Sequence, residues 1–188
     1  VMTTKTSFYQ HNFEDLQDLL KAHAINPASA SLLYRHHYKE KQLGPCDHHN
    51  FSKAAREFVT NNFDFSLPEI ELVHESSDQT VKLLVKLQDG QRVESVLIPF
   101  QSKYTICIST QVGCAMKCSF CFTGTQGLKR NLQTSEIIGQ FILAWNWLKT
   151  NRPDDHQLKN IVYMGQGEPL HNFDAVKKAS EIFLDQHG

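Results

Sequence analysis

The sequence has no excess of charge of either sign. Its 188 residues include 19 Lys or Arg and 20 Asp or Glu, which gives a formal net charge of −1. A strongly basic balance is the usual bulk sign of a nucleic-acid binder, and that sign is missing here. A local basic face is still compatible with a neutral total, so composition alone does not exclude a nucleic-acid partner.

Long apolar runs, internal repeats and low-complexity tracts are also missing. No apolar run is long enough to cross a bilayer, and the first residues show no signal-peptide pattern. Five cysteines are an odd number, and three of them are clustered, which argues against a secreted disulfide framework. We therefore expect a cytoplasmic protein without a membrane partner, whose clustered cysteines serve metal chemistry in a reducing compartment.

The hydrophobic pattern divides the chain into three parts. Residues 1–66 have apolar residues at helical spacing in three segments and predict a small helical module. Residues 67–100 alternate with a period of two on both sides of Asp89 and Gly90, a strong tight-turn signal, and predict a β-hairpin connector. The third part, residues 101–188, follows a different pattern.

Residues 101–188 alternate between expected strands and expected helices. Two apolar runs are typical of buried strands, and two amphipathic segments are typical of helices, the first with Thr134 as its N-cap. In chain order these segments are "YTICIST", "TSEIIGQFILAWNWLK", "LKNIVYMG" and "DAVKKASEIFLD". This order predicts parallel βα units, and hence an α/β fold class.

The stretch "CAMKCSFCF" holds three cysteines within eight residues, Cys114, Cys118 and Cys121. Structural zinc takes four protein ligands, usually as two separated pairs, and no fourth cysteine follows nearby. A cubane iron–sulfur cluster is normally held by four thiolates, so three thiolates leave one iron open to a substrate or cofactor. The ligand count therefore favours an iron–sulfur cluster over zinc.

The spacing C-x3-C-x-aromatic-C resembles the signature of radical S-adenosylmethionine (SAM) enzymes. The resemblance implies that Cys114, Cys118 and Cys121 bind a 4Fe–4S cluster whose open iron chelates SAM. It also implies that Phe120 packs near the adenine of SAM. The location agrees, because the loop directly follows an expected parallel strand, where α/β barrels place their chemistry.

A glycine-rich stretch, "MGQGEPLHN", follows the second expected strand. A glycine-rich strand end followed by proline is more often a turn than a site. The stretch also resembles the "GGE" element of radical SAM enzymes, whose backbone and carboxylate hold the amino group of SAM. On this resemblance the SAM-binding residues are Gly165, Gly167 and Glu168.

The resemblance extends to one family. The segment "CISTQVGCAMKCSFCFTGTQGLKRNLQTSEIIGQ", together with "YMGQGEPLHN", resembles the radical SAM adenine methyltransferases that act on 23S rRNA and tRNA. These are the C2-methylating enzymes and their C8-methylating resistance relative. The implied fold is a small helical module and a β-hairpin, followed by the first two βα units of a partial (βα)6 barrel. The implied partners are 23S rRNA or tRNA, docked by residues 1–66, and an electron donor such as flavodoxin or ferredoxin.

The family resemblance also implies roles for two further residues. Cys107 matches a second functional cysteine seven residues before the cluster motif, which removes a proton from the adenine carbon. Glu94 matches a strand glutamate of the family's active site. The alternatives are a small core residue for Cys107 and a solvated hairpin charge for Glu94, and both remain open.

The mechanism implied by the family uses SAM twice. A first SAM methylates a cysteine near the C-terminus, and a deoxyadenosyl radical from a second SAM activates that methyl group for addition to adenine. A radical is needed because this ring carbon is not nucleophilic enough for direct methyl transfer. We expect C2 methylation, although the sequence does not separate C2 from C8 or rRNA from tRNA.

The chain departs from the family pattern after the cluster motif. No cysteine follows Cys121, and two βα units cannot close a barrel. We therefore expect a truncated chain that does not complete methyl transfer by itself. Two alternatives stay open: a radical SAM enzyme with another substrate, and a non-catalytic remnant that binds a cluster or RNA. Lys129 and Arg130 are either solvated or in contact with RNA phosphates.

Overall fold

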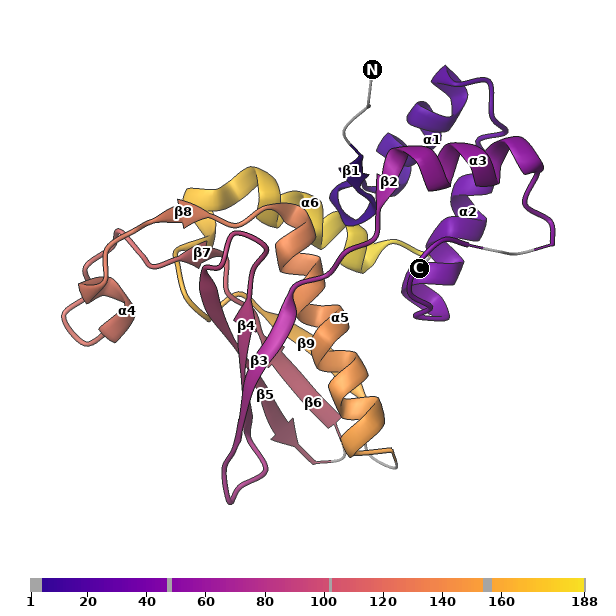
Figure 1. The fold of residues 1–188 in the computed structure, drawn as a ribbon. Helices are drawn as coiled ribbons and strands as arrows, with labels where there is room; N and C mark the ends of the chain where they lie inside the picture. The colour runs from indigo at the N-terminus through magenta and orange to yellow at the C-terminus, as the bar shows by residue number, and fades with distance from the viewer. Residues whose placement is uncertain (1–4, 47–48, 102, 154–156, 188) are drawn as a thin grey trace. The chain divides into compact units, whose positions relative to one another are not determined.

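A computed structural model describes residues 5–46, 49–101, 103–153 and 157–187 (Figure 1). The chain divides into two compact units: unit 1 comprises residues 1–66 and 177–188, and unit 2 comprises residues 67–176. Within the described ranges, no helix combines the length and the apolar character needed to span a membrane. The two units are described separately below.

Unit 1 is built mainly from helices, and the three helical segments predicted for its first part are confirmed. Asn12 caps the first helix, because its side chain accepts a hydrogen bond from Asp15 N at 2.8 Å, and Ser52 caps the third in the same way, from Ala55 N at 3.1 Å. The elements are β1 (Thr6–Ser7), η1 (Phe8–Gln10), α1 (Phe13–Ala22), α2 (Ser29–Tyr34), the π-helical turn η2 (Arg35–Lys39), α3 (Lys53–Asn62) and β2 (Phe63–Asp64), with β1 and β2 paired in parallel.

The core of unit 1 is made largely of aromatic rings. Phe8 is fully buried and packs edge-on against Phe63, with ring centroids 5.7 Å apart. The ring of His37 lies 4.3 Å from that of Phe8 and 4.9 Å from that of Phe65, and the two phenyl rings also contact each other, with centroids 5.4 Å apart. Burial, with a smaller effect of the neighbouring His36, lowers the pKa of His37 to about 3. The buried imidazole is therefore neutral at physiological pH.

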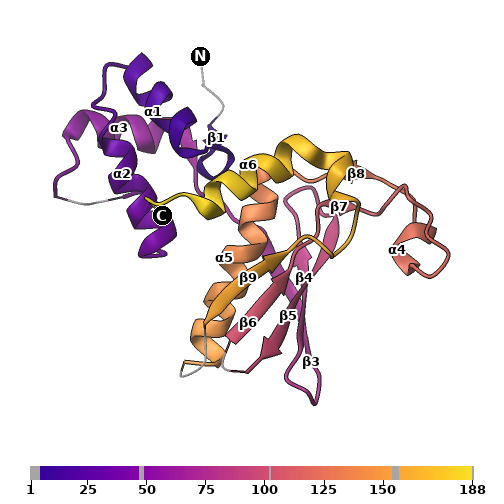
Figure 2. The same ribbon diagram turned by 180° about the vertical axis from the view of Figure 1, so that it is seen from behind.

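Unit 2 contains a five-stranded sheet in the order β3-β4-β5-β6-β9 (Figures 1 and 2). The strands are β3 (Glu69–Glu75), β4 (Val81–Lys86), β5 (Arg92–Phe100), β6 (Lys103–Cys107) and β9 (Leu158–Val162). β4 and β5 form the predicted hairpin, which is confirmed. The hairpin is continuous with the rest of the sheet, because β5 also pairs antiparallel with β6 and β3 pairs with β4.

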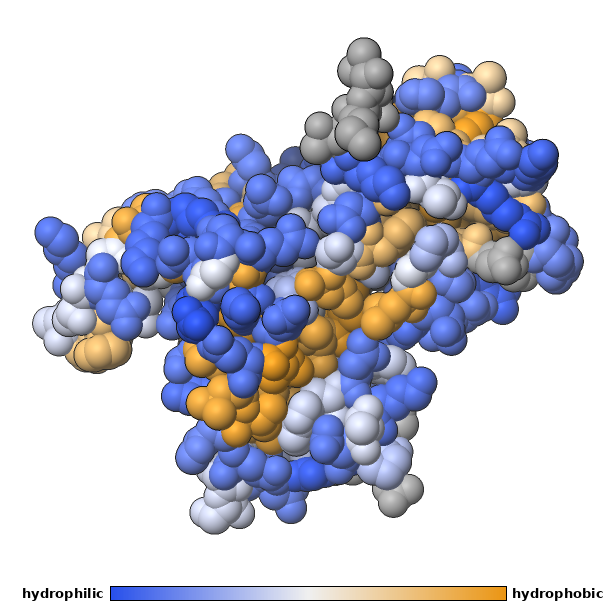
Figure 3. All heavy atoms as spheres, viewed as in Figure 1, coloured by the Kyte–Doolittle hydropathy of each residue, from blue (hydrophilic) through white to orange (hydrophobic). Residues whose placement is uncertain are grey.

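The helix α5 (Thr134–Asn151) covers one face of this sheet (Figure 1). The strand residues on that face are buried, among them Leu83, Leu97 and Ile106, and the helix buries Ile137, Ile138, Ala144 and Leu148. α5 connects β6 to β9, and these two strands are parallel, as the sequence predicted. Figure 3 shows hydrophobic residues gathered along α5 and β3 on the visible face.

The remaining elements of the chain are short, apart from the last helix. They are β7 (Gln111–Val112), α4 (Phe122–Thr125), β8 (Arg130–Asn131), η3 (Pro169–Asn172) and α6 (Phe173–Leu184). α6 confirms the last predicted helix. β7 and β8 pair antiparallel and bracket the cysteine loop and α4. The cysteine loop is thus anchored at both ends.

Two details of the sequence prediction were wrong. The N-cap of α5 is Gln133 and not Thr134: Gln133 N donates to Glu136 Oε2 at 2.8 Å, which closes the first turn one residue earlier. Thr134 is the first helical residue, and its hydroxyl donates to Ala175 O at 3.4 Å. β9 is only partly buried, because it is the last strand of the sheet and has one described neighbour.

Candidate functional site

The ends of β6 and β9 are joined by hydrogen bonds between the segments that follow them. Gly165 N donates to Ile108 O at 3.2 Å, and Thr110 N donates to Gln166 O at 2.8 Å. Two residues after Gln166, Glu168 N donates to the side-chain oxygen of Gln111 at 2.9 Å. The predicted glycine-rich stretch therefore lies beside the segment that leads into the cysteine loop.

The two glycines of this stretch are required by that close approach. A Cβ atom at Gly165 would lie 2.8 Å from Ile108 C and from Ser109 N. A Cβ atom at Gly167 would lie 2.5 Å from Gln111 Cβ, and Gly167 has a φ of +100°. At Gly165 only glycine fits the distance without displacement of the neighbouring segment, and at Gly167 the left-handed backbone is a second requirement for glycine. In this structure the glycines thus serve the packing of the two strand ends.

A buried glutamine on α5 holds the segment after β6 in place. Gln140 is fully buried, and its side-chain oxygen accepts from Ser95 Oγ at 2.8 Å and from Ser109 N at 3.0 Å. Its amide nitrogen donates to Ser109 O at 3.0 Å and to Glu136 O at 3.2 Å. Ser109 Oγ in turn donates to Glu94 O at 2.6 Å and accepts from Gln166 N at 2.9 Å. The helix, the sheet and the glycine-rich stretch are thereby fixed to one another.

Asn172 completes the support of this segment. Its buried amide donates to Thr110 O at 2.9 Å and to Leu132 O at 2.8 Å. Sequence reasoning assigned no role to Asn172 and did not find Gln140. A polar residue within the apolar stretch "IIGQFIL" is the signal that could have identified Gln140, because a buried amide needs several partners.

The cysteine loop begins at a constrained glycine. Gly113 has a φ of +76°, and a Cβ atom there would lie 1.9 Å from Gly127 O. Cys114 follows; it is buried, and its N–H donates to the same Gly127 O at 3.2 Å. Cys121 N donates to Cys118 O at 3.0 Å, which folds the four residues 118–121 into a turn before α4. The start of the loop is therefore held more tightly than its middle.

The three thiols are free and differ in exposure: Cys114 is buried, Cys121 is half-buried and Cys118 is exposed. Within the described ranges, no set of three His, Cys, Asp or Glu side chains is gathered closely enough to hold a metal ion. The donor set fits an iron–sulfur cluster by its chemistry, because three thiols on one loop supply soft, anionic ligands. In the conformation described here the loop does not bring them together.

The other site residues predicted from the sequence differ in how far they are exposed to solvent. Phe120 extends into solvent, with 91% of its surface exposed. Cys107 ends β6 and is buried, and burial raises the pKa of its thiol. Glu168 is partly exposed, and its carboxylate accepts from Leu170 N at 3.0 Å, at the start of η3.

Glu94 lies on β5, directly opposite Leu84 of β4. Cys107 pairs with Val96, two residues along β5, so Glu94 and Cys107 belong to the same face of the sheet. The carboxylate of Glu94 pairs with the ammonium of Lys82 at 3.0 Å, and both side chains are about half exposed. Glu94 thus lies on the face of the sheet that carries Cys107, and its carboxylate already has an ion-pair partner in Lys82.

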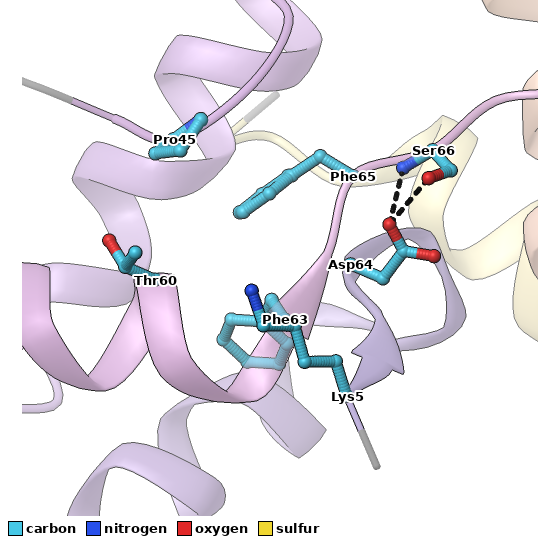
Figure 4. Close-up of a pocket in the computed structure, with 7 residues that line it drawn as sticks. All are labelled: Lys5, Pro45, Thr60, Phe63, Asp64, Phe65 and Ser66. Carbon is cyan, nitrogen blue, oxygen red and sulfur yellow. Dashed lines mark hydrogen bonds between the residues drawn. The ribbon is translucent and has the colours of Figure 1, made fainter.

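A separate hollow lies in unit 1 (Figure 4), with a volume of about 380 Å³. Phe63 and Phe65 form part of its wall. The carboxylate of Asp64 accepts hydrogen bonds from the N–H and the hydroxyl of Ser66, at 2.9 and 2.6 Å. None of the site residues predicted from the sequence lines this hollow.

Comparison with known proteins agrees with the family resemblance, although no protein-family model matches the sequence. The chain is 44% identical over 145 residues to the dual-specificity RNA methyltransferase RlmN of Paracoccus denitrificans, covering 74% of the chain and 37% of that protein. It is 38% identical over 182 residues to RlmN of Bdellovibrio bacteriovorus, covering 97% of the chain and 45% of that protein.

A solved structure gives the same result for the fold. The crystal structure of a radical SAM methyltransferase from Sphaerobacter thermophilus matches 97% of the chain and 53% of its own chain, with a TM-score of 0.83 and 29% identity. The chain thus spans about half the length of the relatives and the solved structure that it matches. The similarity in sequence and in fold leads to one assignment: the chain belongs to the RlmN family of radical SAM methyltransferases.

Proposed function

We propose that the protein is a radical SAM RNA methyltransferase that methylates an adenine carbon, C2, in 23S rRNA, in tRNA or in both. The observation that carries the proposal is the hydrogen-bonded meeting of two strand ends. Residues 108–111 and 165–168 lie side by side there, so that Cys107, the cysteine loop and Glu168 belong to one end of one sheet. The name of the relatives, dual-specificity RNA methyltransferase, supports RNA as the substrate class.

Cys114, Cys118 and Cys121 are the proposed cluster ligands. A 4Fe–4S cluster held by these residues would supply the electron for the cleavage of SAM, and a donor such as flavodoxin or ferredoxin would provide that electron. Because the thiols are not gathered in the described conformation, binding requires the middle of the loop to move. Two observations support such a movement. Cys118, in the middle of the loop, is exposed, whereas the start of the loop is fixed by the tight packing of Gly113 on Gly127.

Gly165, Gly167, Glu168 and Phe120 are the proposed SAM-binding residues. The carboxylate of Glu168 would bind the amino group of SAM, since its contact with Leu170 N leaves oxygen lone pairs available. The ring of Phe120 offers an exposed face for adenine.

Cys107 is the proposed acceptor of the proton from the adenine carbon. Its raised pKa means that it is a thiol at neutral pH, so it must first give up its own proton to another base. The resulting thiolate is then a strong base for the proton of the adenine carbon. Glu94 is proposed to belong to the active site, because it lies on the same face of the sheet as Cys107. The alternative is a structural role, in which Glu94 only forms its ion pair with Lys82.

The domain roles follow the same proposal. Residues 1–66 form the module proposed to dock RNA, residues 67–100 the connecting hairpin, and residues 101–188 the first two βα units of a partial (βα)6 barrel. The parallel pairing of β6 and β9 around α5, followed by α6, supports the last part.

The decisive experiment uses the product of the natural gene, reconstituted anaerobically with iron and sulfide. We expect transfer of a labelled methyl group from SAM to adenine C2 of 23S rRNA or tRNA. Cys118→Ala should remove both bound iron and methyl transfer, because a cluster ligand is lost, whereas Cys46→Ala in unit 1 should retain both.

Three outcomes would contradict the proposal. Cluster assembly without cleavage of SAM would indicate a non-catalytic binding module. A label found on a peptide or a small molecule would indicate a radical SAM enzyme of another substrate class. Iron binding that survives Cys118→Ala would show that the cysteine loop is not the cluster site.

A further inference from the structure

A small polar hollow lies in unit 2 beside the cysteine loop, with a volume of about 150 Å³. Its wall is formed by the turn between β4 and β5, the residues before the cysteine loop, the residues after α4 and one residue of the glycine-rich stretch. The lining residues are Gly90, Gln91, Arg92, Val112, Gly113, Gln126, Gly127, Lys129 and Gln166. Part of this wall is rigid, because Gly113 packs directly on Gly127 O and Lys129 N donates to Val112 O at 2.9 Å.

The cations around this hollow differ in how their charge is compensated. Arg92 donates to Glu71 through two nitrogens, with Nη2 2.7 Å from Oε1. Arg130, next in sequence to Lys129, donates to both oxygens of Glu136 and to Asp89. These carboxylates neutralise both guanidinium groups within the fold.

Lys129 is different. Its ammonium donates to the neutral side-chain oxygen of Gln91 at 3.1 Å. Among the residues that the structure describes, no carboxylate forms an ion pair with Lys129. The lysine is exposed and lines the hollow, so its positive charge is available to an anion.

Two side-chain amides also line the hollow. The backbone of Gln166 is held by the segment after β6, while the side chains of Gln126 and Gln166 form no hydrogen bond within the described part of the chain. Each amide offers two N–H donors. One lysine and two amide donors around a small polar hollow form a recognition set for a phosphate group.

We propose that this hollow binds a backbone phosphate of the RNA substrate, with Lys129 as the charged contact and Gln126 and Gln166 as additional donors. The inference rests on the proposed function and adds a positioning site to it. Gly113 precedes Cys114 and Gln166 lies between the proposed SAM-binding glycines, so the bound phosphate belongs to a nucleotide close to the target adenine. The two neighbouring cations thus have different roles: Lys129 contacts RNA, and Arg130 stabilises the fold through its ion pairs.

The test measures RNA binding by the natural gene product as a function of salt. Lys129→Gln should weaken binding of the substrate RNA about three- to tenfold and lower the slope of log K against log salt by about 0.7 to 0.9, the value for one phosphate contact. Lys129→Arg retains the charge and should retain the slope. Lys159→Gln, at an exposed lysine of β9, is the matched control and should behave as wild type.

Kinetics provide a second measurement. Lys129→Gln should raise KM for RNA and leave KM for SAM unchanged, because the hollow binds RNA and not the cofactor. An unchanged salt slope, a rise in KM for SAM instead of RNA, or an equal loss in Lys159→Gln would each overturn the inference.

The failure of this inference is distinguishable from the failure of the proposed function. If wild type binds and methylates RNA and Lys129→Gln equals it, only the phosphate site is wrong. If wild type binds no RNA, both are wrong.

Discussion

The two units of the molecule bury different kinds of chemistry. The core of unit 1 is dominated by aromatic rings, with His37 packed against both Phe8 and Phe65. Unit 2 buries an apolar layer under α5 as well, but it adds a fully hydrogen-bonded amide, Gln140, and a buried serine, Ser109. Ring packing stabilises a module, whereas a satisfied polar network also fixes which backbone atoms lie together. The unit with the candidate site is the one with that network.

The largest expected effect comes from removing the network of unit 2. Gln140→Leu should lower the free energy of unfolding of unit 2 by about 3 to 5 kcal/mol, because Ser95 Oγ, Ser109 N and Ser109 O would lose buried partners. Tryptophan fluorescence during urea unfolding reports this unit, since Trp145 and Trp147 are both on α5.

The exposed residue Gln88 provides the control. Gln88→Leu should change the stability of unit 2 by less than about 0.5 kcal/mol. A Gln140→Leu variant as stable as Gln88→Leu would show that the network contributes little, and the contrast between the units would not hold.

A second prediction concerns the acid sensitivity of unit 1. His37 has a folded-state pKa of about 3, below its ordinary value of 6.5, so the unfolded chain binds the proton first. Its contribution to stability is therefore present above pH 6.5 and is lost as the pH falls towards 3. Between pH 7 and pH 5 the expected loss is about 2 kcal/mol. Hydrogen exchange of the α3 amides measures it.

Substitution of His37 isolates this contribution. His37→Phe should remove the His37 part of the loss, because a phenyl ring fills the same aromatic stack without a proton to bind. His23→Phe, at an exposed histidine, should keep the wild-type pH dependence. If His37→Phe and wild type lose stability in parallel, the buried imidazole is not the cause.

The smallest expected effect concerns Arg130 at the edge of unit 2. Hydrogen bonds to Glu136 and Asp89 raise the pKa of Arg130, so it remains charged throughout the working pH range. Arg130→Gln should lower the free energy of unfolding of unit 2, measured by thermal denaturation, by about 1 to 2 kcal/mol. The reason is the loss of the half-buried ion pair with Glu136. RNA affinity should change less than in Lys129→Gln. The opposite order of affinities would show that the two residues have exchanged roles.

Much of the fold follows from local patterns. Helical spacing predicted α1, α2, α3, α5 and α6, and alternation on both sides of Asp89-Gly90 predicted the β4–β5 hairpin. The N-cap of α5 was missed because threonine is a common cap residue and glutamine is not, whereas the position of Glu136, which accepts from Gln133 N, starts the helix one residue earlier. The burial of β9 was overestimated because an apolar run does not show how many neighbours a strand has.

The candidate site also has a part that local sequence patterns predict and a part that they do not. The spacing of Cys114, Cys118 and Cys121 and the order of the glycine-rich stretch are local properties, and they were sufficient to predict the family, which the comparisons show. The roles of the individual site residues stay predictions, to be tested by the cysteine variants proposed above.

Tertiary structure decided what the local patterns could not express. It showed that Gly165 and Gly167 are needed where two strand ends approach within van der Waals distance, and that Gln140 joins segments separated by 31 and 45 residues. It also showed that Arg130 is paired with carboxylates and Lys129 with a neutral amide, although the two residues look equivalent in sequence. The physical reason is common to all three: contacts and ion pairs depend on which distant residues lie opposite each other, and no spacing along the chain contains that information.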